Sequence, residues 1–324
     1  MIGARFLPRA ASEQSRLVIA VSEIRSQNPE ANSAILPRMA GLPEIAIVGA
    51  GNLGSALAAS LRRSGYVIEA IIARSSRASQ RKAQSLAKEV GAQVLSDPSG
   101  VLRANLIWFC VPDAEIAQAA RDFAKKINWK GKVAFHSSGA LSSDELAALR
   151  IRGAAVASVH PLMTFVRGSR PPLAGVPFAL EGDGSAVRTA RRIIEDIGAH
   201  AYSIRKKDKA AYHAWGTFAS PLFTALLATT ERVAGLAGVH RKAAKRRIIP
   251  ILLQTLANYA SLEAADAFSG PIIRGDSSTV AQHLHVLRSM PAAREVYSAL
   301  ARSALLYLPA KNKAALKRLL DAQR

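Results

Sequence analysis

Short apolar runs alternate with amphipathic stretches from Pro43 to about Ile204. The runs EIAIVG, VIEAIIA, LIWFCV, KVAFH, AAVASVH, VPFALEG and AHAYSI have the length and composition of buried strands. Between them, apolar residues recur every three or four positions. Stretches such as SALAASLRRSG and RASQRKAQSLAKEVG end at glycine, as amphipathic helices often do. This alternation predicts an α/β fold with a doubly wound, mostly parallel sheet.

The strand pattern stops after Ile204. Ala- and Leu-rich helical runs follow, and we expect them to break at Gly238, Pro250, Pro271 and Pro291. An all-α domain is therefore predicted after the sheet. The predicted boundaries are 1–42 for an N-terminal extension, 43–205 for the α/β domain and 206–324 for the helical domain.

The extension at 1–42 has no sustained periodicity, and we predict that it is disordered. It contains five arginines and no lysine. Its three glutamates argue against a transit peptide, which is usually poor in acidic residues. An alternative is that translation starts at Met39, just before the first predicted strand.

Composition narrows the classes of protein that the chain can belong to. Its net charge is +21, from 44 basic and 23 acidic residues. The basic residues are scattered, and the clusters RKKDK and HRKAAKRR lack interleaved aromatics, so we expect anionic small molecules rather than nucleic acid as partners. No apolar run is long enough to predict a membrane span. The single cysteine, Cys110, excludes a disulfide framework and fits a cytoplasmic protein, and we expect no metal site.

The sequence GAGNLG follows the first predicted strand and opens a helix, which is the context of a dinucleotide-binding turn. The first glycine allows the tight turn, the second lets a pyrophosphate approach, and the third lets helix and strand pack closely. We therefore predict that 43–205 is a Rossmann domain. The predicted phosphate-binding residues are Gly49, Gly51, Asn52, Leu53 and Gly54. The alternative is a turn of the same shape that binds nothing.

The choice of cofactor is read at the end of the second strand, where an acidic residue would bind the ribose 2′-hydroxyl of NAD. This sequence has Arg74, Ser75 and Arg77 there, whose side chains can neutralise and hydrogen-bond a 2′-phosphate. We therefore predict NADP rather than NAD. In the alternative interpretation, the two arginines only begin a solvated helix.

Five motifs in one order carry a resemblance to a known family: LIWFCVPDAEI, VAFHSSGAL, SVHPLMTF, KAAYHAWGTFAS and FSGPIIRGDSSTVAQHL. They resemble the Rossmann-like proteins with a C-terminal domain of unknown function 2520. These are similar to pyrroline-5-carboxylate reductases and to 6-phosphogluconate dehydrogenase-like NADP-dependent oxidoreductases. The resemblance implies an oxidoreductase, without naming its substrate. Trp215, Pro221 and Met163 depart from the family pattern, which puts this member's chemistry in doubt.

Three polar motifs follow consecutive strands of the predicted sheet, and ligands bind at that edge of such sheets. We predict cofactor contacts from Val111, Pro112 and Ser137, substrate contacts from Ser138 and His160, and a catalytic role for His136. The alternatives are structural: Asp113 as a helix cap, the serines as turn formers and the histidines as core residues.

Lys209, His213, Gly216 and Ser220 are spaced four, three and four apart, so they share one face of a predicted helix. The resemblance implies that the first long helix of the second domain presents a catalytic group. His213 suits proton transfer because its pKa lies near neutrality, whereas Lys209 would need a lowered pKa. Tyr212 is a predicted substrate contact. The alternative places Lys209 in an exposed basic run.

The last motif, GPIIRGD, precedes another helix. Asp276 can cap this helix, and it would share a face with Thr279 and His283. Arg274, in the loop before it, suits bidentate binding of a carboxylate or phosphate. We predict substrate contacts from Arg274, Asp276 and His283, with a structural ion pair between Arg274 and Asp276 as the alternative.

Together, these patterns predict an NADP-dependent oxidoreductase that transfers hydride to or from a C=O or C=N carbon of a small, anionic metabolite. The alternative is a non-catalytic NADP-binding sensor or interaction protein. A homodimer through the helical domain is expected, because a two-fold interface is the commonest oligomer.

Overall fold

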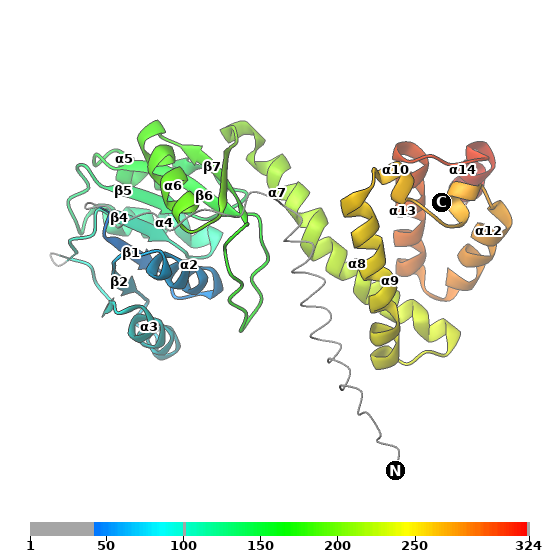
Figure 1. Ribbon diagram of the computed structural model, residues 1–324, viewed down its shortest axis with the longest axis horizontal. Coiled ribbons are helices and arrows are strands. Elements are labelled where there is room, and N and C mark those ends of the chain that lie inside the picture. The colour runs from blue at the N-terminus through cyan, green and yellow to red at the C-terminus, as the bar shows by residue number, and fades with distance from the viewer. Residues whose placement is uncertain (1–41, 100–101, 323–324) are drawn as a thin grey trace, which may run out of the picture. The chain divides into compact units, whose positions relative to one another are not determined.

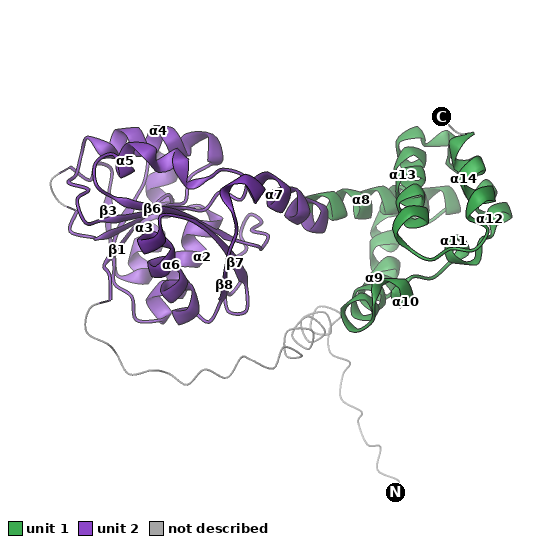
Figure 2. Cartoon of the chain, turned by 90° about the horizontal axis from the view of Figure 1, so that it is seen from above, with its two compact units in different colours: residues 1–29, 221–324 green, residues 30–220 purple. Residues whose placement is uncertain are grey.

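The computed structural model describes residues 42–99 and 102–322 (Figure 1). The predicted N-terminal extension lies outside the described residues, apart from Leu42. The described chain divides into two compact units, coloured separately in Figure 2, and the division falls between Ser220 and Pro221.

The first unit is built on an eight-stranded sheet with the order β3-β2-β1-β4-β5-β6-β7-β8. The strands from β3 to β6 in that order are parallel, β7 is antiparallel to β6, and β8 is parallel to β7. This confirms the predicted fold class. The strands are β1 (Ile45–Val48), β2 (Ile68–Ile72), β3 (Gln93–Leu95), β4 (Leu106–Phe109), β5 (Val133–His136), β6 (Ala155–Pro161), β7 (Pro177–Gly182) and β8 (His200–Ser203).

Helices cover both faces of this sheet. Figure 2 shows α4 and α5 above the sheet and α2 and α6 below it. One hydrophobic core joins α2, α3 and α6 to the sheet, and a second core joins α4 and α5 to its other face. The helices of this unit are α2 (Asn52–Arg63), α3 (Arg77–Val90), α4 (Asp113–Ala124), η1 (Ser143–Leu146), α5 (Ala147–Arg150), α6 (Gly184–Asp196), η2 (Lys206–Asp208) and α7 (Lys209–Thr217).

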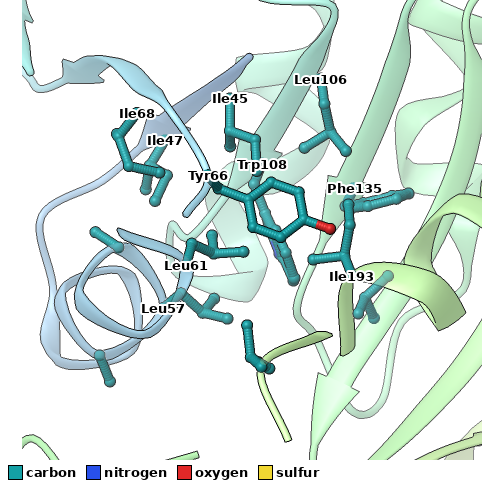
Figure 3. Close-up of a cluster of buried hydrophobic side chains, with 14 of the residues drawn as sticks. Ile45, Ile47, Leu57, Leu61, Tyr66, Ile68, Leu106, Trp108, Phe135 and Ile193 are labelled. Carbon is teal, nitrogen blue, oxygen red and sulfur yellow. The ribbon is translucent and has the colours of Figure 1, made fainter. Parts of the chain in front are cut away.

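The first core surrounds Tyr66, whose ring lies among Leu61, Trp108 and Ile193 in Figure 3. Tyr66 is fully buried, and its hydroxyl donates a hydrogen bond of 2.5 Å to Oδ2 of Asp196 on α6. This bond satisfies the one polar atom that the ring brings into the core. It also ties α6 to the start of β2.

The second unit is helical, as predicted. Its core is a small cluster that includes Val280, Leu284 and Leu316. Its elements are η3 (Phe218–Leu222, which begins in the first unit), α8 (Phe223–Val233), η4 (Ala234–Ala237), α9 (Arg241–Ser261), α10 (Ala264–Ala267), α11 (Pro271–Arg274), α12 (Ser277–Val286), η5 (Leu287–Ser289), α13 (Pro291–Tyr307) and α14 (Lys313–Asp321).

Three of the four predicted helix breaks coincide with helix boundaries. Gly238 ends η4 in the left-handed conformation, and Pro271 and Pro291 are the first residues of α11 and α13. The break predicted at Pro250 is wrong, because α9 continues through it. A proline inside a helix removes one backbone hydrogen bond, and here the helix accommodates that loss. Pro221 lies within a π-helical turn, η3.

No single helix among the described residues is both long and apolar enough to cross a membrane. One pair, Lys206–Ala237 with Arg241–Ser261, meets the length and composition requirement only when the two are taken together, and they are bent by 116° at the break.

Candidate active site at the carboxyl ends of the strands

The glycine turn joins β1 to α2 at the point where the strand order reverses, which is where open α/β sheets bind ligands. Gly49 has a φ of +105°, and a Cβ on it would lie 2.5 Å from the carbonyl oxygen of Cys110. A Cβ on Gly54 would lie 2.1 Å from the carbonyl oxygen of Gly49. The packing of the turn itself therefore requires both glycines.

Gly51 differs from these two glycines, because a Cβ on it would meet nothing within 4 Å. It is the N-cap of α2, and within the described chain no side chain caps this helix and no acidic residue occupies its first turn. The helix therefore presents free backbone N–H groups and the positive end of its dipole beside an open backbone. These residues fit the pyrophosphate of a dinucleotide.

The side chains of the two residues after Gly51 contact other parts of the protein and not the open side of the turn. The Asn52 side chain donates a long hydrogen bond of 3.4 Å to the carbonyl oxygen of Phe165, and Leu53 packs partly buried against the first core. Any cofactor contact by them would come through their backbone N–H groups. Their predicted role stays a prediction.

Arg74, Ser75 and Arg77 are exposed and follow β2, at the same edge of the sheet as the glycine turn. Nη1 of Arg74 lies 3.0 Å from Oε1 of Glu115, in the first turn of α4. No local pattern in the sequence indicates Glu115. It lies 41 residues further along the chain, and only the order of the strands brings α4 beside the end of β2.

Ser138 follows β5 and links the loop after this strand to the start of α4. Its hydroxyl donates a 2.7 Å hydrogen bond to Oδ2 of Asp113 and accepts bonds from the backbone N–H groups of Ala140 and Leu141. The N-cap of α4 is Pro112, so Asp113 is not the cap that the alternative interpretation placed there. Ser138 is 3% exposed, and its hydroxyl is fully engaged inside the protein.

His136 ends β5 and is fully buried. The backbone N–H of Ser138 donates to Nδ1, so Nε2 carries the proton and donates to the carbonyl oxygen of Ser142 at 2.9 Å. Burial lowers the pKa of His136 to about 4, so the ring is neutral at physiological pH. Both nitrogens are engaged with backbone groups, which favours a positioning role. The predicted catalytic role stays a prediction.

Ser137 is held in the same loop. Its hydroxyl accepts a 2.8 Å hydrogen bond from the indole N–H of the buried Trp108 on β4. The loop after β5 is therefore fixed by Trp108 of β4, by Asp113 of α4 and by the backbone of its own turn. The predicted cofactor contacts of Val111, Pro112 and Ser137 stay predictions.

Lys209 begins α7 and is 2% exposed, so the alternative that placed it in a solvated basic run is wrong. Its ammonium group donates a 2.9 Å hydrogen bond to the carbonyl oxygen of Ser138 and a second bond to the hydroxyl of Ser158. None of the described carboxylates bonds to it. Burial lowers the pKa of Lys209 to about 8, although Glu181 and Asp113 act in the opposite direction.

Three aromatic side chains meet next to this lysine. The hydroxyl of Tyr212 lies 2.8 Å from Nδ1 of His160, at the end of β6. The ring centroids of His160 and His213 are 6.3 Å apart. A Cβ on Gly139 would lie 2.7 Å from Cδ2 of His213 and 2.8 Å from Nε2 of His160. Only glycine at this position leaves both imidazoles where they are.

The pKa values of this group follow from its burial. Burial, helped by the charge of Lys209 and the neighbouring histidines, lowers the pKa of His160 to about 4. Burial also raises the pKa of Tyr212, with a further contribution from Tyr202. The imidazole is therefore neutral and the phenol protonated at physiological pH.

The remaining predicted residues belong to the second unit. Asp276 caps α12, as predicted, because it accepts bonds from both the backbone N–H and the hydroxyl of Thr279. These bonds lower the pKa of Asp276. Nδ1 of His283 lies 3.1 Å from the hydroxyl of Tyr297. Substrate binding by Arg274, Asp276 and His283 stays a prediction.

The three departures from the family pattern are scattered. Met163 packs partly buried against the first core, Trp215 is 58% exposed on α7, and Pro221 lies in η3.

In the part of the chain that the structure describes, no group of three or more His, Cys, Asp or Glu side chains is arranged to hold a metal ion.

The fold and the turn define a protein of the Rossmann-like class with a helical domain after its sheet. The sequence matches a Rossmann-like domain over residues 26–161 and the domain of unknown function DUF2520 over residues 176–304. The chain thus carries a Rossmann-like domain followed by a DUF2520 domain, as the resemblance implied. No curated protein matches the sequence.

Solved structures share this fold at low sequence identity. A protein from Thermotoga maritima is 23% identical, with a TM-score of 0.62, over 86% of this chain and 99% of that one. A reductive aminase from Aspergillus terreus, in complex with NADPH and ethyl-5-oxohexanoate, is 16% identical, with a TM-score of 0.60, over 88% and 100%. A pyrroline-5-carboxylate reductase from Coxiella burnetii is 15% identical, with a TM-score of 0.52, over 87% and 98%.

Proposed function

We propose that the protein is an NADP-dependent oxidoreductase that transfers hydride to or from a C=O or C=N carbon of a small, anionic metabolite. One observation carries the proposal: the glycine turn is open at Gly51, beside the uncapped N-terminus of α2. The reductive aminase, with its NADPH complex, and the pyrroline-5-carboxylate reductase support the same class.

The chain's own residues suggest how the cofactor would be held. The backbone around Gly51 and the N–H groups of α2 would bind the pyrophosphate, and Arg74 would bind the 2′-phosphate. When bound, NADPH supplies the hydride. Arg74 would have to exchange Glu115 for the phosphate, and an exposed ion pair of this kind is worth only about 0–1 kcal/mol.

Titration with both cofactors tests this assignment. The wild-type protein should bind NADPH more tightly than NADH, measured by isothermal titration calorimetry. Arg74→Ala should weaken NADPH binding roughly 10- to 100-fold and leave NADH binding nearly unchanged, because a hydrogen bond to a charged group is worth roughly 1.5–3 kcal/mol. Arg103→Ala, which removes another exposed arginine of the same unit, is the matched control. Equal or tighter binding of NADH would exclude the NADP assignment.

For proton transfer we favour His213 over Lys209. The side chain of His213 is exposed on α7 next to His160, whereas both bonds of Lys209 go to groups inside the protein. A metabolite screen that follows NADPH oxidation would identify a substrate. His213→Ala should then lower turnover by 10²- to 10⁴-fold, the usual contribution of a general acid or base, without weakening NADPH binding. Unchanged turnover in both His213→Ala and His136→Ala would exclude this site.

A non-catalytic NADP-binding sensor is the second candidate. One observation favours it: the polar side-chain atoms of Ser138, His136 and Lys209 form hydrogen bonds within the protein, which leaves them less available to a substrate. Tight NADPH binding with no oxidation across a broad panel of ketones, aldehydes and imines would support it. Turnover of any of these compounds would dismiss it.

We also propose a homodimer through the helical domain. None of the residues of α8, all of which the structure describes, is buried, and Ala244 is the one buried residue among the 21 of α9. Ile251 and Tyr259 on α9 are 60% and 66% exposed. A partner subunit would cover exposed apolar side chains of this kind. Analytical ultracentrifugation should give a dimer, and Ile251→Glu should shift it to a monomer. A monomeric wild-type protein would refute the proposal.

A further inference from the structure

The hydrogen bond between Tyr212 and His160 joins α7 to the end of β6 within the first unit. The two rings are nearly perpendicular, at 86°, with centroids 5.5 Å apart, and the hydroxyl lies 2.8 Å from Nδ1. Tyr212 is 8% exposed, so water competes little for this bond. A buried bond of this kind fixes the orientation of the imidazole.

The direction of the bond follows from the protonation states of its partners. A neutral imidazole has one nitrogen that donates and one that accepts, and a protonated phenol can donate. Tyr202 offers the other possible acceptor for the Tyr212 proton, since their ring centroids are 6.4 Å apart. Tyr202 is near enough to raise the pKa of Tyr212. Its buried hydroxyl nevertheless has no partner at hydrogen-bond distance and angle within the described chain, whereas the Tyr212 hydroxyl lies 2.8 Å from Nδ1 of His160. Tyr212 therefore donates to Nδ1 of His160.

The other nitrogen of His160 then carries the ring proton. Among the residues described here, none forms a hydrogen bond with Nε2. This nitrogen lies beside Gly139, 2.8 Å from the point where a Cβ on that residue would stand. Cδ2 of His213 lies 2.7 Å from the same point. The N–H of Nε2 is thus a donor without a protein acceptor, next to the group that we favour for proton transfer.

We propose that Tyr212 is a positioning residue that holds His160 in the tautomer protonated on Nε2, and that this N–H donates a hydrogen bond to the substrate oxygen or nitrogen that receives charge during hydride transfer. The inference rests on the proposed function. His160 keeps its proton and stabilises the developing charge, as preorganised neutral donors do in other active sites. Its low pKa suits this role, because the ring stays neutral.

Nitrogen-15 NMR of histidine-labelled protein tests the tautomer directly, without substrate or cofactor. The His160 signals are identified by their loss in His160→Gln. In the wild-type spectrum, Nδ1 should have the shift of an unprotonated nitrogen and Nε2 that of a protonated one. Tyr212→Phe should mix the two tautomers, because the donor to Nδ1 is lost. The control, Tyr202→Phe, removes a hydroxyl from the same cluster and should leave the tautomer unchanged.

A wild-type spectrum with the proton on Nδ1 would overturn the proposal, and this arm does not depend on any variant folding. Unchanged His160 signals in a folded Tyr212→Phe protein would overturn it as well. Once a substrate is known, Tyr212→Phe should lower kcat about 10-fold with little change in KM. Failure of NADPH binding would refute the proposed function while leaving the tautomer measurement intact, so the two failures are distinguishable.

Discussion

Replacing Gly51 with alanine separates the stability of the glycine turn from its proposed use. Gly51 has a φ of −76° and a ψ of −174°, a conformation that alanine adopts without strain. The added methyl group meets no protein atom within 4 Å. It occupies the space through which a pyrophosphate would approach the backbone. The substitution should therefore spare the fold and impair the cofactor site.

The expected magnitudes follow from these distances. Alanine is a poorer N-cap than glycine, which lowers the free energy of unfolding by up to about 1 kcal/mol. Alanine also restricts the unfolded chain, which raises the free energy of unfolding by roughly 0.4–1 kcal/mol. The two effects oppose each other, so stability should change by less than about 1 kcal/mol. Loss of one charge-assisted hydrogen bond to phosphate costs about 1.5–3 kcal/mol, which weakens NADPH binding roughly 10- to 100-fold. Binding should therefore suffer much more than folding.

Gly54→Ala is the matched control, because its methyl group would lie 2.1 Å from the carbonyl oxygen of Gly49. Backbone must move to relieve that contact, and overpacking of this kind costs about 1–3 kcal/mol. Thermal unfolding should show a lower Tm for Gly54→Ala and a nearly unchanged Tm for Gly51→Ala. Calorimetric titration should then show weak NADPH binding by Gly51→Ala. NADPH binding at wild-type strength in that variant would refute the reasoning.

Three further predictions concern the first unit. The low pKa of Lys209 means that the unfolded chain binds more protons between pH 8 and 10.5, so Lys209 contributes a rise of at most about 3 kcal/mol to the free energy of unfolding across that range. The raised pKa values of Cys110 and Tyr66 act in the opposite direction in both proteins, so the difference between wild type and Lys209→Met in urea titrations should rise with pH, and a constant difference would contradict the burial of the ammonium group. Tyr66→Phe should cost about 1 kcal/mol and lower the Tm by roughly 2–4 °C, since Asp196 regains water; an unchanged Tm would show that the bond is neutral. Gly139→Ala should shift the NMR signals of both neighbouring histidines, and unshifted signals would contradict the crowding that the structure shows.

The sequence predicts the sheet well, because strand and helix periodicities are local properties of the chain. Every predicted strand is present, and the parallel order follows from the alternation with helices. The short edge strand β3 was missed, since its three residues are partly exposed and carry no apolar run. The helix break predicted at Pro250 is absent, because α9 continues through this residue. A proline shows that one backbone hydrogen bond of the helix is lost, but it does not show whether the neighbouring turns keep the helix intact.

The candidate site could be predicted less completely, because its geometry depends on contacts between distant strands. Spacing placed Lys209 and His213 on one helix, but burial of the lysine under the loop after β5 is a tertiary effect. Glu115 carries no local signal that pairs it with Arg74. The bond between Tyr212 and His160 joins residues 52 positions apart, and neither residue alone indicates the other.

The space beside Gly139 has a consequence for related sequences. A side chain there would have to displace at least one of the two imidazoles, so only glycine is compatible with both histidines in their present positions. The three positions should therefore vary together among relatives, although they lie on separate elements. Relatives that keep all three are the natural candidates to share this protein's chemistry, and those that lose the glycine mark where that chemistry has diverged.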